Sequence, residues 1–383
     1  MIAHERRTAV WLLAVIVFLI AFGSLYPFSF SLSGAGALER LGELPQAGTT
    51  RSDVAANVLL YLPLGTCLAW LIAARQGAAL AVLGATLIAA ALSFVIEFSQ
   101  LYETRRVASL ADFACNTAGA FLGAGLALAI ARTRRRLNVS PFAGFLRHPL
   151  AAALFFSWIG YRLAPFALVF DTTEWAAAVA SSAWSWPAPG EMLAHLVAWL
   201  TILFLGERLM PGRATALAAG AMAAVLAGRV LFSGLGLEAA EVAGMTAALL
   251  LARPLGALPR PKAARLLAAA LLALIAWQGL APFDFQLAQD RFALLPFGES
   301  LTQYRAANLA DTFLRVFTNG ALVWLLFQAG LSALAAAGFG AGAVFAIELL
   351  QTWLPGQTAE ITDPLLAICA GGLIALFERE SGP

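Results

Sequence analysis

Residues 96–119 read IEFSQLYETRRVASLADFACNTAG and place charged and amide side chains between two strongly apolar stretches. The flanking stretches, 78–101 and 110–131, are each long enough to cross a bilayer as a helix, since a span takes about 17–25 residues. The polar residues therefore lie in and beside a short turn that joins two predicted membrane helices. This helical hairpin is the element from which we predict the rest of the fold.

The composition of the whole chain is that of a membrane protein. Of its 383 residues, 61% are hydrophobic and 12% are charged, and the mean hydropathy is +0.81. Soluble domains carry about twice this share of charged residues, so lipid must cover much of the apolar surface. The net charge of +2 gives no reason to expect a nucleic-acid partner. The three cysteines lie in apolar segments without metal-ligand spacing, and we expect neither a cofactor nor a metal.

Apolar stretches of comparable length recur along the chain and predict an all-α fold with about twelve transmembrane helices. The predicted helices are 8–26, 54–74, 78–101, 110–131, 149–166, 191–207, 214–233, 237–253, 264–281, 312–330, 332–353 and 362–378. The first of them lacks a small-residue cleavage motif, so we interpret it as a membrane helix and not as a signal peptide.

A recurring phrase at helix ends divides these helices into groups of four. It reads Leu25-Tyr26-Pro27-Phe28, then Leu163-Ala164-Pro165-Phe166, then Leu280-Ala281-Pro282-Phe283. Each copy ends an apolar run, where proline is a common helix stop, and precedes a long polar loop. We predict three four-helix units, at 8–131, 149–253 and 264–378.

The first and third predicted units also share a pattern of polar residues. The corresponding residues are Asn57, Glu97, Gln100 and Asp112 in the first unit and Asn319, Glu348, Gln351 and Asp363 in the third. The middle unit has His195 and Glu241 at two of these positions and lacks the Glu-x-x-Gln pair. We therefore expect the middle unit to be structural, or to be a partner for the other two.

The basic residues predict which side of the membrane each turn faces. With both termini in the cytoplasm, most of the 24 Lys and Arg residues fall in cytoplasmic connections, as the positive-inside rule requires. The turn in 96–119 and its counterpart in the third unit then lie at the outer face.

The outer turn of the first unit is the predicted ligand site. A charge at the bilayer centre costs about 2.5–3.5 kcal/mol, so we expect Glu97 to be either protonated or paired, with Arg105 or Arg106 as its partner. The full candidate set is Asn57, Glu97, Gln100, Arg105, Arg106, Asp112 and Asn116, with a second cluster at Asn319, Glu348, Gln351 and Asp363.

Three interpretations of the first cluster remain open. The polar groups could satisfy one another and fix the hairpin, or they could bind a lipid head group or another anionic ligand through arginine. Glu97, Asp112 and Asn116 could also hold a divalent metal, because Mg²⁺ and Ca²⁺ prefer oxygen ligands. Next to the cluster, the spacing Gly119-x-x-x-Gly123 predicts a close approach of this helix to a neighbour.

These residues resemble the VanZ-like membrane family. The pattern begins with Asn57-Val-Leu-Leu-Tyr-Leu-Pro63-Leu-Gly65 and continues with Glu97-x-x-Gln100, Arg105, Asp112, Asn116 and Gly119. It covers most of 8–131; the third unit matches more loosely, with Ala367 in place of Asn116 and no arginine in its outer turn, and the middle unit is degraded. The resemblance implies a multi-pass protein of the bacterial inner (cytoplasmic) membrane. It also implies a link to tolerance of glycopeptide and lipoglycopeptide antibiotics.

We therefore expect a protein that binds or shields a cell-envelope lipid or amphiphile at the outer leaflet, with membrane lipids as its partners. The alternatives are a membrane-embedded enzyme on lipid-linked substrates, with Glu97 or Asp112 as general base, or a transporter. The sequence offers no nucleophile beside a paired base, so an enzyme is the less favoured reading.

Overall fold

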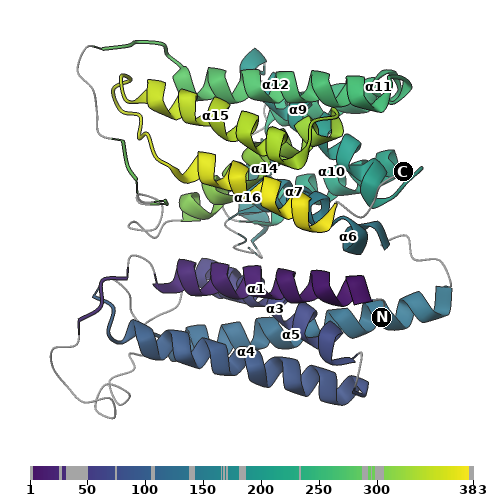
Figure 1. The fold of residues 1–383 in the computed structure, drawn as a ribbon, viewed down its shortest axis with the longest axis vertical. Helices are drawn as coiled ribbons and strands as arrows, with labels where there is room; N and C mark the ends of the chain where they lie inside the picture. Colours follow the sequence, from purple (N-terminus) through teal and green to yellow (C-terminus); the bar gives the residue numbers. More distant parts are fainter. Residues whose placement is uncertain are drawn as a thin grey trace. The chain divides into compact units, whose positions relative to one another are not determined.

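The fold, taken from a computed structural model, consists of α-helices and connecting segments, as the sequence predicts (Figure 1). Extended pairing within the described residues is confined to two isolated bridges, Phe30 with Glu103 and Ala293 with Glu360. The structure describes residues 3–25, 28–31, 51–73, 76–104, 108–137, 143–164, 166, 169, 171–180, 187–232, 234–286, 292–294, 296–297 and 306–378.

Each apolar stretch singled out in the sequence coincides with a helix. Among the described residues, seven helices are long and apolar enough to cross a membrane. These segments are Ala56–Ala73, Ala78–Gln100, Pro189–Leu209, Ala214–Leu231, Arg260–Leu280, Leu309–Gln328 and Ala333–Gln351. The chain is thus a multi-pass membrane protein, and the number of twelve spans stays a prediction.

Contacts divide the chain into a first unit, formed mainly by 1–140, and a second unit, formed mainly by 141–383. The predicted middle and third groups of helices both belong to the second unit, where helices of one group pack against helices of the other. The division into three four-helix units stays a prediction.

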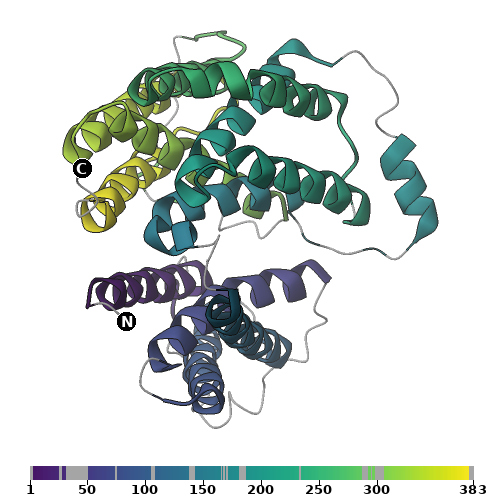
Figure 2. The same ribbon diagram turned by 90° about the vertical axis from the view of Figure 1, so that its right-hand side faces the viewer.

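The described part of the first unit is a bundle of four helices, drawn in both ribbon views (Figures 1 and 2). Its helices are α1 (Ala3–Leu25), α3 (Arg51–Ala73), α4 (Ala78–Gln100) and α5 (Leu110–Leu137). Tyr61 and Leu64 of α3, together with small residues of α4 and α5, form its core. Alanine and glycine at these contacts let the backbones come close, as is usual for helices packed in lipid.

The pair α3 and α5 packs backbone against backbone. A Cβ atom at Gly119 would overlap the carbonyl oxygen of Val58, and one at Gly123 would overlap that of Leu62. The hydroxyl of Thr66 lies 3.0 Å from the carbonyl oxygen of Gly123 and 2.9 Å from that of Leu62. The close approach predicted from the Gly-x-x-x-Gly spacing is therefore present.

The second unit contains the remaining helices. They are α6 (Ala143–Arg147), α7 (Pro149–Leu163), α8 (Thr172–Ala180), α9 (Pro189–Leu209), α10 (Ala214–Leu231), α11 (Ala239–Ala257), α12 (Arg260–Leu280), α14 (Ala306–Gln328), α15 (Ala333–Gln351) and α16 (Thr362–Phe377). The pairs α7 with α14 and α9 with α12 join the predicted middle and third groups. Trp199 and Trp324 are fully buried in the common core.

The phrase at the helix ends has a common backbone geometry. Phe28, Phe166 and Phe283 all have positive φ angles, of 64°, 60° and 65°. A bulky residue seldom adopts this left-handed conformation, so its presence in three copies reflects the same abrupt change of direction after each helix. The residues Tyr26, Pro27 and Pro165 of the phrase lie outside the described part of the chain.

Candidate functional site

Glu97 lies in the last turn of α4, and the residue is only 5% exposed. Its Oε2 atom accepts a hydrogen bond of 2.8 Å from the backbone N–H of Ser109, the residue just before α5. A charged acceptor makes a stronger bond than a neutral one, and this bond ties together the two ends of the turn. Arg105 and Arg106, the predicted partners of Glu97, lie outside the described residues.

Two amide side chains connect the same turn to neighbouring helices. The Nε2 atom of Gln100 donates to the carbonyl oxygen of Ser24 in α1, at 2.8 Å. The Nδ2 atom of Asn116 donates to the hydroxyl of Ser93 in α4, at 3.0 Å. The Oδ1 atom of Asn116 is buried and has no hydrogen-bond partner in the described part of the structure.

Asn57 and Asp112, like Gln100, are half-buried members of the candidate set. Asp112 lies in the first turn of α5, where the helix dipole favours a carboxylate, and Asn57 lies on α3. The described residues contain no group of three His, Cys, Asp or Glu side chains that could hold a metal ion. Glu97 and Asn116 are instead engaged by Ser109 and Ser93.

The third group of helices makes the same two hydrogen bonds. The Oε2 atom of Glu348 accepts from the backbone N–H of Glu360 at 2.9 Å, again 12 residues along the chain, as for Glu97. The Nε2 atom of Gln351 donates to the carbonyl oxygen of Gly279 at 3.1 Å. Gly279 stands four residues before the phenylalanine of its helix-end phrase, as Ser24 does. Equivalent side chains therefore hold equivalent turns.

Arg315, in α14, is a member of this second cluster that sequence reasoning missed. Its Nη1 atom lies 2.6 Å from Oε1 of Glu360 and 3.2 Å from Oδ1 of Asp363, and its Nε atom lies 2.7 Å from Oδ2 of Asp311. The arginine that the sequence lacks in the turn between α15 and α16 is thus supplied by a neighbouring helix. The i, i+4 spacing of Asp311 and Arg315 was the available signal.

The remaining polar member, Asn319, is also held by its own helix. Its Nδ2 atom donates to the carbonyl oxygen of Arg315 at 2.9 Å. Its Oδ1 atom, like that of Asn116, is buried without a hydrogen-bond partner in the described part of the chain. Within the described residues, each cluster therefore contains one buried amide oxygen without a hydrogen-bond partner.

Replacing Arg315 tests how much this second cluster depends on its cation. Arg315→Met should lower the free energy of unfolding by about 2 kcal/mol, less than for a fully buried pair because the arginine side chain is 21% exposed. Burial raises the pKa of Glu360, and Arg315 opposes that rise. A raised carboxyl pKa favours folding at low pH and costs stability as the pH rises through the ordinary value. The stability deficit of the variant should therefore widen as the pH rises above the ordinary carboxyl pKa.

Thermal unfolding of the purified protein across this pH range measures the effect. Arg315→Lys should restore most of the stability, and Arg213→Met, at an exposed position, is the matched control. A deficit for Arg315→Met that does not change with pH would contradict the role assigned to its carboxylate neighbours.

The middle group of helices, expected to be degraded, carries a buried ionic cluster. Glu241, at the start of α11, is 0% exposed, with its Oε1 atom 2.7 Å from Nε of Arg162 and its Oε2 atom 3.3 Å from Nε of Arg229. The Nε2 atom of His195 lies 3.6 Å from Oε2 of Glu238. The pattern of polar residues shared by the first and third units does not predict this cluster, because Arg162 and Arg229 have no counterpart in that pattern.

Among the comparisons with known proteins, one family model matches the first unit. Residues 9–132 match the model of the VanZ/LLP1 family, which confirms the resemblance found in the sequence of that unit. The match contains Asn57, Glu97, Gln100 and Asp112 and ends before the second unit, whose looser resemblance stays a prediction. No curated protein and no solved structure matches the chain.

Proposed function

We propose that the polar cluster of the first unit binds the head group of an envelope lipid or a similar amphiphile at the outer leaflet. In this proposal the protein lies in the bacterial cytoplasmic membrane with both termini inside, and binding at the cluster underlies tolerance of glycopeptide and lipoglycopeptide antibiotics. The VanZ/LLP1 match supports this assignment because it covers the whole cluster.

The proposal rests on one observation: some residues of the cluster are bonded to the backbone of the turn or of α1, and others are not seen to make these bonds. Glu97 and Gln100 are held by Ser109 and Ser24, so they fix the turn and have little capacity left for a ligand. Asn57 and Asp112 are half-buried, on α3 and at the start of α5, and Arg105 and Arg106 belong in sequence to the turn itself. Arginine recognises phosphate and carboxylate groups with paired donors, and a preorganised turn lowers the entropic cost of binding.

The recurrence of the two hydrogen bonds supports an internal repeat, and with it a second site in the third group of helices. There Gln351 and Glu348 hold the turn, while Asn319 and Asp363 take the places of Asn57 and Asp112. Arg315 would supply the cation. We assign the main ligand site to the first unit, because in the third group the arginine is already paired with three carboxylates.

Asp112→Asn and Arg105→Ala test the proposal in bacteria that express the full chain. Both should accumulate in the membrane at the level of the parent protein, because Glu97 and Gln100, which bond to Ser109 and Ser24, are unchanged in both variants. Both should lose most of the tolerance to a lipoglycopeptide antibiotic, by a factor of about four or more in the inhibitory concentration, if each contact contributes about 1 kcal/mol. Immunoblots of membrane fractions measure the protein level alongside the inhibitory concentration.

Asp171→Asn, at an exposed position of the second unit, is the matched control and should keep full tolerance. A loss of tolerance that follows the protein level in every variant would favour a purely structural cluster. Tolerance that is undiminished in both variants would contradict the proposed site.

A further inference from the structure

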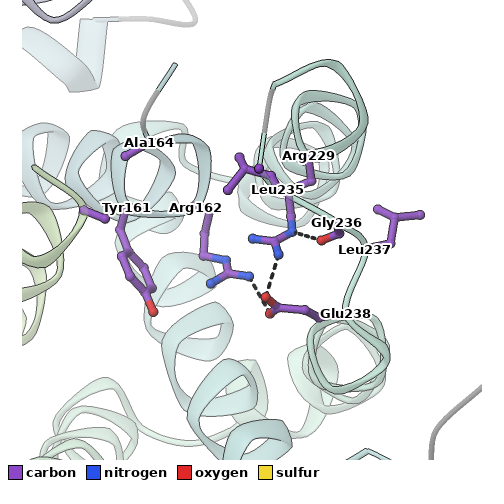
Figure 3. Close-up of a pocket in the computed structure, with 10 residues that line it drawn as sticks. Tyr161, Arg162, Ala164, Arg229, Leu235, Gly236, Leu237 and Glu238 are labelled. Atoms are coloured by element: carbon purple, nitrogen blue, oxygen red, sulfur yellow. Dashed lines mark hydrogen bonds and ion pairs between the residues drawn. The ribbon is translucent and has the colours of Figure 1, made fainter. Parts of the chain in front are cut away.

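A cavity of about 450 Å³ lies in the second unit, where α7 and α10 end and α11 begins (Figure 3). Its walls include Tyr161, Arg162, Arg229, Gly234, Gly236 and Glu238. Cavities of this size hold small molecules or their polar parts. Neither the candidate set from the sequence nor the VanZ/LLP1 match, which ends at residue 132, reaches these residues.

Two arginines from different helices meet in this cavity, and each side chain is only 6% exposed. Arg162 donates from Nε and Nη2 to Glu241, and Arg229 donates from Nε to the carbonyl oxygen of Gly236 at 2.7 Å. These bonds fix the planes of the two guanidinium groups, which face each other in Figure 3. In the described part of the chain, the Nη1 atoms of both arginines have no hydrogen-bond partner.

The carboxylate of Glu238 bridges the two guanidinium groups. Its Oε2 atom lies 2.8 Å from Nη2 of Arg162, and its Oε1 atom lies 2.6 Å from Nη2 of Arg229 (Figure 3). One oxygen on each arginine is the arrangement that an oxyanion ligand adopts between two such groups. The Glu238 side chain is 47% exposed, whereas Glu241 is completely buried. Glu238 can therefore turn toward solvent while Glu241 stays in place.

We propose that this cavity binds the phosphate group of a ligand between Arg162 and Arg229, in the position that the Glu238 carboxylate holds. With Glu238 turned away, the two arginines and Glu241 carry a net charge of about +1, which favours an anion. Nη2 of Arg162 keeps its bond to Glu241, whereas Nη2 of Arg229 loses its carboxylate partner and can donate to a ligand. Together with the two Nη1 atoms, such donors suit the oxygens of phosphate. The remaining volume accommodates the rest of a lipid head group.

Binding to the purified full chain in a non-ionic detergent tests this site. The probes are inorganic phosphate and dihexanoyl phosphatidic acid, and the readout is the rise of the unfolding midpoint with probe concentration. Glu238→Gln removes the negative charge that competes with the ligand for the two arginines, and it should lower the apparent Kd by about tenfold. Arg229→Lys keeps the charge but loses the paired donors and should weaken binding by about tenfold.

Glu191→Gln, an exposed acid in the first turn of α9, is the matched control and should bind like the parent protein. Glu97→Gln should also leave this binding unchanged, which separates the site from the proposed function of the first unit. Saturable binding of both probes identifies phosphate itself as the recognised group, and binding of phosphatidic acid alone assigns the site to a lipid head group.

Two results would overturn the proposal. One is the absence of saturable binding of either probe to both the parent protein and Glu238→Gln while both unfold cooperatively. The other is an affinity in Glu238→Gln equal to or weaker than that of the parent protein, because the carboxylate would then not occupy the ligand position.

Discussion

Gly123→Ala is expected to lower the free energy of unfolding of the first unit by about 3 kcal/mol. The added methyl group would overlap the carbonyl oxygen of Leu62, which belongs to the backbone of α3 and cannot rotate away as a side chain could. The helices α3 and α5 would have to separate, and the hydrogen-bond distance from Thr66 to the carbonyl oxygen of Gly123 would lengthen. The midpoint of thermal unfolding and the amount of folded protein in membranes both measure the loss.

Gly125→Ala provides a matched control on the same helix. No atom lies within 4 Å of a Cβ placed at Gly125, so this substitution should be neutral or should stabilise the helix by up to about 1 kcal/mol. Equal effects of the two substitutions would mean that the close approach of α3 and α5 does not limit the stability of the unit.

Glu241→Gln should lower the free energy of unfolding of the second unit by about 3–5 kcal/mol, because it leaves buried arginines without their full counter-charge. Glu241 is completely buried and contacts both Arg162 and Arg229. Only the half-exposed Glu238 would then balance the two guanidinium groups. Thermal unfolding of the purified protein, with Glu191→Gln as an exposed control, measures the difference.

A double variant shows whether Glu241→Gln destabilises the second unit through unbalanced charge or through lost packing. Replacing Arg162 and Glu241 together by leucine leaves Arg229 and Glu238 as a neutral pair at 2.6 Å. Apolar replacement of a whole buried ion pair is often close to neutral, so the double variant should be more stable than Glu241→Gln. If it is the less stable of the two, the cluster acts mainly through its packing.

Hydropathy alone predicted the long helices, because lipid requires long apolar segments whatever the tertiary structure; the short helices α6 and α8 were not predicted. The spacing of Glu97 and Gln100 from Asp112, and its recurrence at Glu348, likewise predicted which turns carry polar side chains. The close contact at Gly123 followed from residue size. These features depend on local sequence, and so a single chain is sufficient to find them.

The hydrogen-bond partners could not be predicted in the same way. Glu97 is held by a backbone amide, that of Ser109, and any residue type provides such a donor. The positions of Arg315 and Arg162 at their clusters depend on which helices pack together, and the pairing of α7 with α14 has no signature in either segment. The middle group looked degraded because its charges are arranged differently from those of the other two.

The backbone bonds of Glu97 and Glu348 also bear on how such turns diverge. Because each glutamate accepts from a main-chain amide, this bond does not depend on the side chain at that position, which is a hydroxyl in Ser109 and a carboxylate in Glu360. The same backbone geometry of the turn is therefore compatible with different side chains at this position. Each of these two side chains has its own partner, since Ser109 Oγ accepts from the backbone N–H of Ala111 and Glu360 pairs with Arg315.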